Sequence, residues 1–323
     1  MTQNYWKQTL EHRFTRRRAL GVAATGTLGA AFLAACGGGG SEDKTDRASL
    51  VVKPVDTAKM AKRGGSLVVP ATADTPGFDP YLPNAALATL QNPVMAHLLQ
   101  YKPGVMEQTA YEPMPDIAES FEFAPDGLSM TLKLRQNMKW HNLPPVNGRV
   151  IDVDDITKSW DRFAQLASYR ADIANSVNPN APVLGITSTD ARTLVIKLKE
   201  PISYLPAMLA ANSNGALKML PKEADSTFNF RNGMIGAGPY MMTEYKPSQS
   251  FSFKRHPDYY DKTRPYIDMI ERPIMPEYAT AIAQLKAGNM LTFSTGAAER
   301  VRQEDVVPLK RETPDLNLSL IHI

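Results

Sequence analysis

Residues 121–134 read FEFAPDGLSMTLKL and have the period-two pattern of a β-hairpin. Phe121 and Phe123 alternate with polar neighbours, and residues 124–127 (Ala-Pro-Asp-Gly) supply a turn. Beyond this turn every second residue is again apolar: Leu128, Met130, Leu132 and Leu134. Successive side chains of a strand point to opposite faces, so this alternation buries one face. We therefore predict a β-hairpin with one face in the core.

The neighbouring sequence predicts both strands and helices. Further strands are expected at 66–70, 194–198, 251–253 and 269–274. Helices are expected at 85–101 with a kink or restart at Pro93, around 156–163, and at 277–287 with Gly288 as the stop. The mixture of hairpins and helices predicts an α/β (mixed α+β) fold.

The N-terminus has the order of an export signal: basic residues, a short apolar stretch, then small residues before a cysteine. Arg16 and Arg17 resemble the paired arginines of a twin-arginine signal. Residues 33–36 (Leu-Ala-Ala-Cys) resemble a bacterial lipobox, in which the cysteine receives a lipid. We expect residues 1–35 to be removed, Cys36 to be lipidated, and the protein to lie outside the cytoplasm, anchored to the cell membrane.

The charge and the cysteine count of the chain argue against several classes of function. Residues 1–35 hold five basic and one acidic side chain, so the remaining chain is close to neutral although the whole carries +3. That removes the compositional argument for nucleic-acid binding. Cys36 is the single cysteine, which excludes an internal disulfide and a cysteine-based metal cluster. Residues 36–63 are rich in glycine and polar side chains and are expected to form a flexible tether.

Two groups of polar residues suggest chemistry that the surrounding sequence does not support. Asp152, Asp154 and Asp155 have carboxylates suited to calcium, but no glycine or distal glutamate follows at the spacing of a calcium loop. They are more simply helix N-caps. His256 and Asp258 lie two residues apart, without the further groups that a catalytic site needs, and are interpreted as a turn beside a strand. We predict no catalytic residue and no metal site.

Two apolar or glycine-rich features have open structural interpretations. Trp140 and His141 follow the hairpin and fit the core better than a pocket wall. Gly236-Ala237-Gly238 is too short for a dinucleotide fingerprint, and Pro239 prevents the helix start that such a motif requires. These glycines indicate unusual torsions or a close approach of backbone.

Taken together, the motifs resemble family 5 solute-binding proteins of ABC transporters, of the peptide, oligopeptide and nickel-binding type. No single motif is decisive; the set occurs in the order of that family. The matching segments are 64–67, 78–80, 118–127, 132–141, 154–160, 196–201, 236–240 and 255–259. The resemblance covers residues 64 to about 290.

The resemblance implies a periplasmic-binding-protein-like fold of two lobes that close on a solute. The expected function is an extracytoplasmic receptor of an ABC importer, which captures a peptide or peptide-like solute and delivers it to the permease and ATPase subunits. No cofactor is implied. By family position, the residues expected near the ligand are Ala73, Asp74, Thr75, Gly238, Pro239 and Tyr240. The alternatives are an exported twin-arginine-dependent enzyme and a receptor for chelated nickel, haem or an oligosaccharide.

The resemblance also predicts the division of the chain. We expect a first lobe at 64–272 with an inserted subdomain at about 96–215, and the start of a second lobe, largely missing, at 273–317. Residues 318–323 match the translation of a transposon-based sequencing adapter, so we interpret the end as a truncated gene model; an ordinary strand is the alternative. A chain lacking most of one lobe is expected not to bind peptide tightly.

Overall fold

The structure is a computed structural model that describes residues 55–81, 85–104, 110–213, 216–231, 233–290, 292 and 301–316. The chain divides into two compact units, Met1–Arg47 and Ala48–Ile323, and only residues of the second are described. Arg16, Arg17, Cys36 and the segment 318–323 therefore lie outside the described residues. A short 3-10 helix, Ala58–Met60, precedes the first strand.

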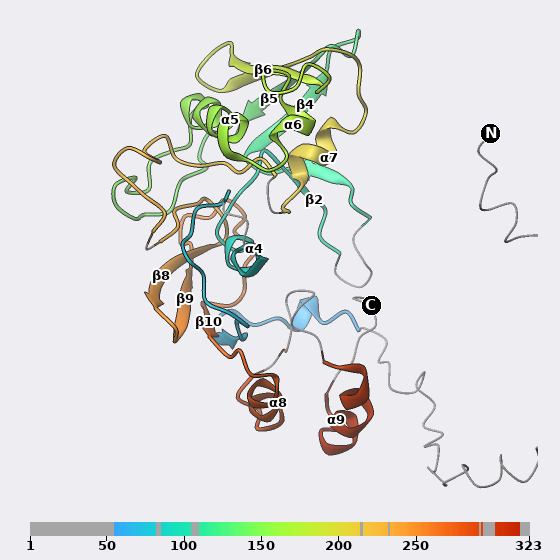
Figure 1. Cartoon of the computed structure of the whole chain (residues 1–323), viewed down its shortest axis with the longest axis vertical. Helices are drawn as coiled ribbons and strands as arrows, with labels where there is room; N and C mark the ends of the chain where they lie inside the picture. The colour runs from blue at the N-terminus through green and yellow to red at the C-terminus, as the bar shows by residue number, and fades with distance from the viewer. Residues whose placement is uncertain are drawn as a thin grey trace, which may run out of the picture. The chain divides into compact units, whose positions relative to one another are not determined.

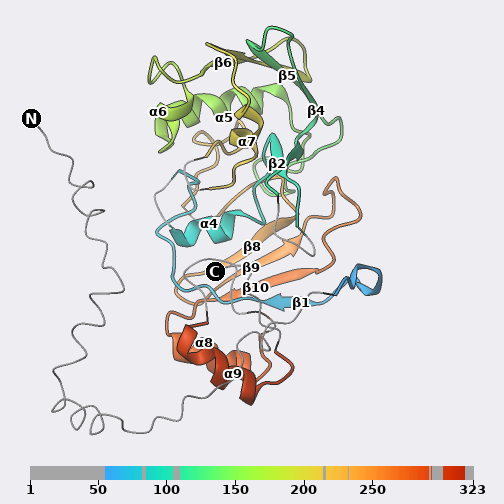
Figure 2. The same ribbon diagram turned by 90° about the vertical axis from the view of Figure 1, so that its right-hand side faces the viewer.

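The first sheet joins the beginning of the described chain to residues some two hundred positions later. Its order is β1 (Ser66–Val68), β10 (Met269–Pro273), β9 (Ser250–Arg255) and β8 (Tyr240–Lys246). β1 runs parallel to β10, and the other neighbours are antiparallel. Figures 1 and 2 show these strands side by side, with α4 (Ala85–Gln91) lying against them. The strands predicted at 66–70, 251–253 and 269–274 are confirmed.

The second sheet contains the predicted hairpin. β4 (Ala118–Phe123) and β5 (Ser129–Leu134) pair through the turn, followed by β7 (Thr193–Leu198) and β6 (Val183–Ser188), all antiparallel. The alternating residues of β5 and β7 lie almost completely inside: Met130, Leu132, Leu134, Leu194, Ile196 and Leu198. Leu128 precedes β5 and is 41% exposed, so the buried face begins two residues later than its pattern suggests.

Helix α5 (Val153–Leu166) packs on this sheet through Ile156, Trp160 and Phe163, which share one hydrophobic core with the strands. Two short helices, α6 (Arg170–Ile173) and α7 (Leu205–Ala210), complete this part of the chain (Figure 1). The same core contains Phe251 and Phe253 of the first sheet, so a continuous apolar interior reaches both sheets. Trp140 and His141 are completely buried in it, as predicted.

The helix predicted at 85–101 is only partly correct. α4 ends at Gln91, and Leu99–Tyr101 forms the strand β2, paired with β3 (Pro113–Pro115). The carbonyl oxygens of Pro93 and Val94 accept hydrogen bonds from the backbone N–H groups of Tyr240 (2.9 Å) and Gly238 (2.8 Å). Because these carbonyls bind a distant strand, they do not continue the helix, and tertiary pairing overrides the apolar spacing.

A second, smaller core lies on the side of the first sheet opposite α4 (Figure 2). It is built from α8 (Tyr278–Lys286) and α9 (Val306–Glu312), which the 3-10 helix Gln303–Asp305 precedes. Val68 of β1 packs against it. Gly288 has φ of 73° directly after α8, which confirms the predicted helix stop. Within the described ranges, no helix has the length and apolar character needed to cross a bilayer.

Candidate functional site

A cavity of about 480 Å³ lies between the α4–β2 connection, residues 210–212, the entry to β8 and the loop after β9. This volume falls in the range of small-molecule sites. Its wall combines apolar and aromatic side chains with a few polar groups: Asn92, Met95, Ala96, His97, Gln100, Tyr101, Pro103, Asp116, Ala210, Asn212, Gly238, Pro239, Tyr259, Arg264, Pro265, Tyr266 and Ile267. Several of these residues were not predicted as site residues.

Gly238 and Pro239 form part of the cavity wall, and the segment 236–240 that contains them lies directly against the backbone of residues 93–94. A Cβ atom on Gly236 would come within 2.0 Å of the carbonyl oxygen of Val94. A Cβ atom on Gly238 would come within 2.7 Å of both the carbonyl carbon and the carbonyl oxygen of Val94. Neither glycine has φ in the left-handed region. Close backbone approach, one of the two alternatives raised by the sequence, therefore explains both glycines.

Two buried histidines hold the same wall in place. His141 accepts the backbone N–H of Gly236 at Nδ1 (3.3 Å), which leaves Nε2–H to donate to the Gly238 carbonyl oxygen (3.1 Å). His256 points Nδ1 at the same oxygen (3.3 Å). Burial, followed by the neighbouring His256, lowers the pKa of His141 to about 3. Both rings therefore act as neutral clamps on the turn. His256 is buried at the end of β9 as part of this clamp. The described residues around His256 and Asp258 do not form a catalytic group.

The carboxylate of Asp116 lines the cavity and is almost completely buried. Its Oδ2 accepts the backbone N–H of His97 (2.9 Å), and the Tyr260 side chain also hydrogen-bonds to it. Gln100 Nε2 donates in turn to the Tyr260 hydroxyl (2.9 Å). Burial raises the pKa of Asp116 to about 6 despite these bonds. The cavity wall thus contains a carboxylate that changes charge near neutral pH.

Lys218 lies behind the cavity wall and is 1% exposed. Its ammonium group donates to the carbonyl oxygen of Asn212 (2.9 Å) and lies 3.3 Å from His97 Nε2. Burial lowers the pKa of Lys218 to about 8. The pKa of His97 is also held well below its ordinary value, by burial and then by the charge of Lys218. The pair is therefore a charged lysine against a neutral imidazole at pH 7.

The structure brings only part of the predicted ligand set to this cavity. Gly238 and Pro239 line it. Tyr240 is mostly buried and donates its hydroxyl to the Ile267 carbonyl oxygen (3.0 Å), outside the lining set. Ala73 is exposed, and Thr75 is buried with its hydroxyl on the Gly77 carbonyl oxygen (2.6 Å).

Asp74 is held by the turn between β8 and β9. Its Oδ1 accepts the Tyr245 hydroxyl (2.8 Å), and its Oδ2 accepts the backbone N–H of Ser248 (2.7 Å). Residues 73–75 do not line the cavity. Their expected contact with ligand therefore remains a prediction. The hydrogen bonds of Asp74 and Thr75 do not test it.

Sequence reasoning missed His97, Asp116 and Lys218. Only Lys218 leaves a local signal: it stands inside the apolar run Ala-Leu-Lys-Met-Leu at 216–220, where a lysine is unusual. Its partner His97 is 121 residues away in the sequence, so no spacing pattern joins them.

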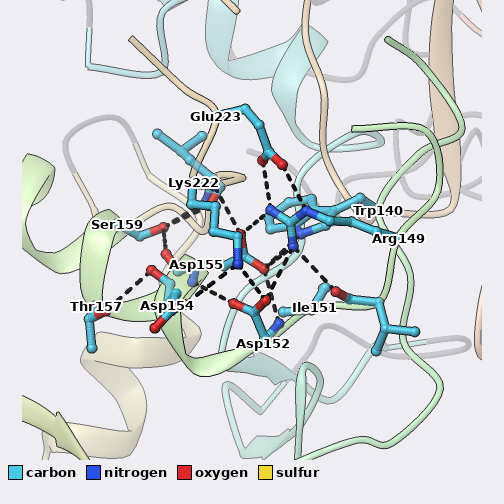
Figure 3. Close-up of polar contacts among 12 residues, drawn as sticks. Trp140, Arg149, Ile151, Asp152, Asp154, Asp155, Thr157, Ser159, Lys222 and Glu223 are labelled. Carbon is cyan, nitrogen blue, oxygen red and sulfur yellow. Dashed lines mark hydrogen bonds and ion pairs between the residues drawn. The ribbon is translucent and has the colours of Figure 1, made fainter. Parts of the chain in front are cut away.

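The acidic cluster before α5 is a structural network (Figure 3). Asp152 caps the helix by accepting the N–H of Asp155, whose side chain accepts the N–H of Asp152 in return, so the predicted N-cap is confirmed. The buried Asp155 carboxylate also accepts Trp140 Nε1 (3.0 Å) and two nitrogens of Arg149 (2.7 and 2.5 Å). Arg149 reaches Glu223 as well (2.6 Å). The described part of the chain holds no group of three or more side chains arranged to bind a metal ion.

The family assignment follows from comparison with known proteins. The sequence model of the bacterial extracellular solute-binding proteins, family 5 (middle region), matches residues 112–321, which is well over half of the chain. The chain belongs to this family. The description of this family is that of solute-binding proteins, and the relatives reported below are likewise named as binding proteins.

The similar proteins of family 5 are longer than this chain. The oligopeptide-binding protein AppA of Bacillus subtilis is 24% identical over 95% of this chain and 53% of its own length. Heme-binding protein A of Haemophilus influenzae is 27% identical over 83% of this chain and 49% of its own length. The chain thus spans about half the length of these relatives.

Solved structures show the same fold. AppA from Bacillus subtilis, in complex with a nonapeptide, matches with a TM-score of 0.61 and 21% identity over 78% of this chain and 47% of its own. DppA from Helicobacter pylori, a periplasmic binding protein in complex with the peptide STSA, matches with a TM-score of 0.60 and 20% identity over 72% and 47%. The predicted α/β fold of the periplasmic-binding-protein type is confirmed.

Proposed function

We propose that this family 5 protein is the receptor of an ABC importer and captures peptides or peptide-like solutes outside the cytoplasm. The observation that carries the proposal is the family match, together with a fold shared with two peptide complexes. The partners would be the permease and ATPase subunits, which supply the energy, so the receptor itself needs no cofactor. An extended peptide can be held through its backbone groups while varied side chains are tolerated.

The division into lobes is part of the same proposal. β1 pairs with β10, so residues between β1 and β8 form an excursion from the first sheet that includes the whole second sheet. This topology supports a first lobe at 64–272 with a subdomain inserted at about 96–215, followed by a second lobe from 273. Limited proteolysis with mass spectrometry should find the earliest cuts near those boundaries.

The receptor function is tested most directly with protein from a resequenced gene. Sequencing across the codons for Asp315 to Ile323 defines the reading frame, and the purified product is then analysed by native mass spectrometry for bound peptides. Calorimetry with synthetic tripeptides to nonapeptides follows. For a product that carries both lobes we expect dissociation constants in the micromolar range or tighter, about −8 kcal/mol. Absence of both co-purified and added peptide would contradict the proposal.

Haem is the second candidate solute, because one relative is named for haem binding. A Soret band in the purified protein, or one that appears on titration with hemin at micromolar concentration, would support haem over peptide. The band should be absent from a control protein purified in parallel.

We also propose that lipid at Cys36 anchors the protein to the membrane. The motif at 33–36 and its position after an apolar stretch support this. A Cys36→Ser variant should be recovered in the soluble extracytoplasmic fraction, whereas the unsubstituted protein sediments with membranes. Equal distribution of the two proteins would contradict the anchor.

A further inference from the structure

His97 has a hydrogen-bond partner at one ring nitrogen and, among the described residues, none at the other. Nε2 lies 3.3 Å from the Lys218 ammonium group, and a charged ammonium can only donate. The imidazole proton must then be on Nδ1. Within the described residues no acceptor pairs with Nδ1, although the His97 side chain is 7% exposed and lines the cavity. The Nδ1–H of His97 is thus available to donate a hydrogen bond to a molecule in the cavity.

The positive charge of Lys218, behind this hydrogen, is not balanced by a carboxylate of the described residues. Lys218 is buried, and no carboxylate of the described chain forms an ion pair with it. A buried ammonium without a counter-charge is costly, even with hydrogen bonds to neutral acceptors. A molecule that brings negative charge to His97 would reduce that cost.

The other charged groups at the cavity already have partners. Asp116 is held by the His97 N–H and by Tyr260, and Arg135 Nε donates to the Asp116 carbonyl oxygen (2.6 Å). Arg264 is ion-paired with Asp261 (3.0 Å). Among the described residues, Lys218 is therefore the cation beside the cavity whose hydrogen bonds are all to neutral groups and which forms no ion pair with a carboxylate.

We propose that the cavity binds a carboxylate group of a solute, which accepts the Nδ1–H of His97 while Lys218 supplies the positive charge through Nε2. The chain of donors runs from the Lys218 ammonium to the imidazole and from the imidazole to the carboxylate. This inference rests on the proposed solute-binding function and assigns the chemistry of one part of the solute. The low pKa of His97 keeps the ring neutral, which preserves this direction of donation.

Sodium acetate and acetamide are the probes, because they have nearly the same shape and differ in charge. The purified chain is labelled with ¹⁵N-histidine, and the ring resonances are followed during each titration at constant ionic strength and pH 7. We expect saturable shifts of the His97 nitrogens with acetate and none with acetamide. The rings of His141 and His256 do not line the cavity but hydrogen-bond to the carbonyl oxygen of the lining residue Gly238, so their resonances report movement of this wall and should shift less than those of His97. Absence of a saturable acetate shift, or equal shifts with both probes, would overturn the proposal.

A lysine variant tests the origin of the charge. Lys218→Met keeps an unbranched side chain of similar length and removes the ammonium, so acetate affinity should fall at least roughly tenfold. Lys158→Met removes a cation from the exposed surface of α5 and should leave acetate affinity unchanged. If Lys218→Met retains its affinity for acetate, Lys218 is not the source of the positive charge that attracts the carboxylate. If that variant does not fold, the comparison of acetate with acetamide on the unsubstituted chain still decides.

The outcome of the acetate titration and the outcome of the peptide-binding test can be told apart. A protein that binds peptides but shows no acetate-dependent shift at His97 keeps the receptor function and loses the carboxylate site. A protein with the acetate shift that binds no peptide keeps the carboxylate site and loses the peptide assignment. Trialanine and its C-terminal amide then show whether the carboxylate at His97 is the end of a peptide.

Discussion

His141 and His256 pack edge to face, with ring centroids 4.8 Å apart, and both direct a ring nitrogen to the Gly238 carbonyl oxygen. One is supplied by the segment after the hairpin and the other by the end of β9. His141 therefore ties the second half of the described chain to the first at the cavity wall, and His256 supports the same carbonyl oxygen. This arrangement needs neutral imidazoles, because His141 must accept the N–H of Gly236 at Nδ1.

Acidification should destabilise the fold through His141. Its pKa is about 3 in the folded protein, because of burial and then the adjacent His256, against roughly 6.5 in an unfolded chain. The unfolded state binds the proton more readily, so stability is present above about pH 6.5 and is lost as the pH falls below it. The contribution at pH 5 is about 2 kcal/mol of unfolding free energy relative to pH 7. Urea denaturation at a series of pH values measures it.

A His141→Gln variant isolates this contribution. Asp116 acts in the opposite direction, because its raised pKa of about 6 makes protonation favour the folded state. Burial also lowers the pKa of His97 and His256, so the unsubstituted chain shows the net effect of all these groups. We expect the variant to be less stable at pH 7 and to lose less stability than the unsubstituted chain between pH 7 and pH 5. Parallel pH curves for the two proteins would exclude His141 as a titrating group in this range.

Gly238→Ala, in the segment that leads into β8, should be strongly destabilising. The new Cβ would lie 2.7 Å from backbone atoms of Val94, which cannot rotate away as a side chain can. We expect a loss of at least about 3 kcal/mol in unfolding free energy, measured by urea denaturation.

Gly185→Ala provides the matched control for the same atom change. A Cβ atom at Gly185 of β6 would have nothing within 4 Å, and its φ is outside the left-handed region. This variant should change stability by no more than about 0.5 kcal/mol. Similar losses in the two variants would indicate a general effect of replacing glycine, and would remove the argument from close approach.

In this chain, local sequence patterns predict local structure. Where such a prediction is wrong, contacts between residues far apart in the sequence are the reason. The hairpin at 121–134 and the cap of α5 follow from residues within a few positions of one another. The helix predicted through Tyr101 fails because Pro93 and Val94 give their carbonyl oxygens to β8, which lies far along the sequence. The pairing of β1 with β10 likewise joins segments about two hundred residues apart.

The candidate site likewise combines residues that the sequence predicts with residues that only the tertiary fold brings together. By family position, Gly238 and Pro239 are expected near the ligand; both line the cavity, and their contact with a ligand stays a prediction. The contact between Lys218 and His97 has no local pattern, because each residue alone is compatible with several environments. Only the tertiary fold, which places Asn212 and Lys218 beside the α4–β2 connection, brings the two side chains together.

Asp155→Ala should unfold the chain more readily than any other substitution in the acidic cluster. Its carboxylate is completely buried and accepts hydrogen bonds from Trp140, Arg149, Asp152 and the backbone of Lys222 (Figure 3). Removal leaves the Arg149 charge with Glu223 as its main partner and several donors without an acceptor. We expect a loss of about 3–5 kcal/mol in unfolding free energy by chemical denaturation.

Asp154→Ala is the control, because Asp154 is a neighbouring acidic residue in the first turn of the same helix. It is exposed and forms one ion pair with Lys222 at 3.5 Å. Its loss should cost no more than about 1 kcal/mol. Added calcium should stabilise neither the unsubstituted chain nor the variants, and a calcium-dependent increase in melting temperature would contradict the capping interpretation.

Asp74→Asn tests whether residues 73–75 contact the solute, and Tyr245→Phe is its control. Both variants weaken the hydrogen bond between the Asp74 carboxylate and the Tyr245 hydroxyl, but only the first removes the charge. If Asp74 faces a peptide, its substitution should weaken binding by roughly tenfold or more, and Tyr245→Phe should leave affinity nearly unchanged. Calorimetry with protein from the resequenced gene measures both. Equal losses would show that Asp74 acts only by holding the turn between β8 and β9, and the ligand prediction for this residue would then be wrong.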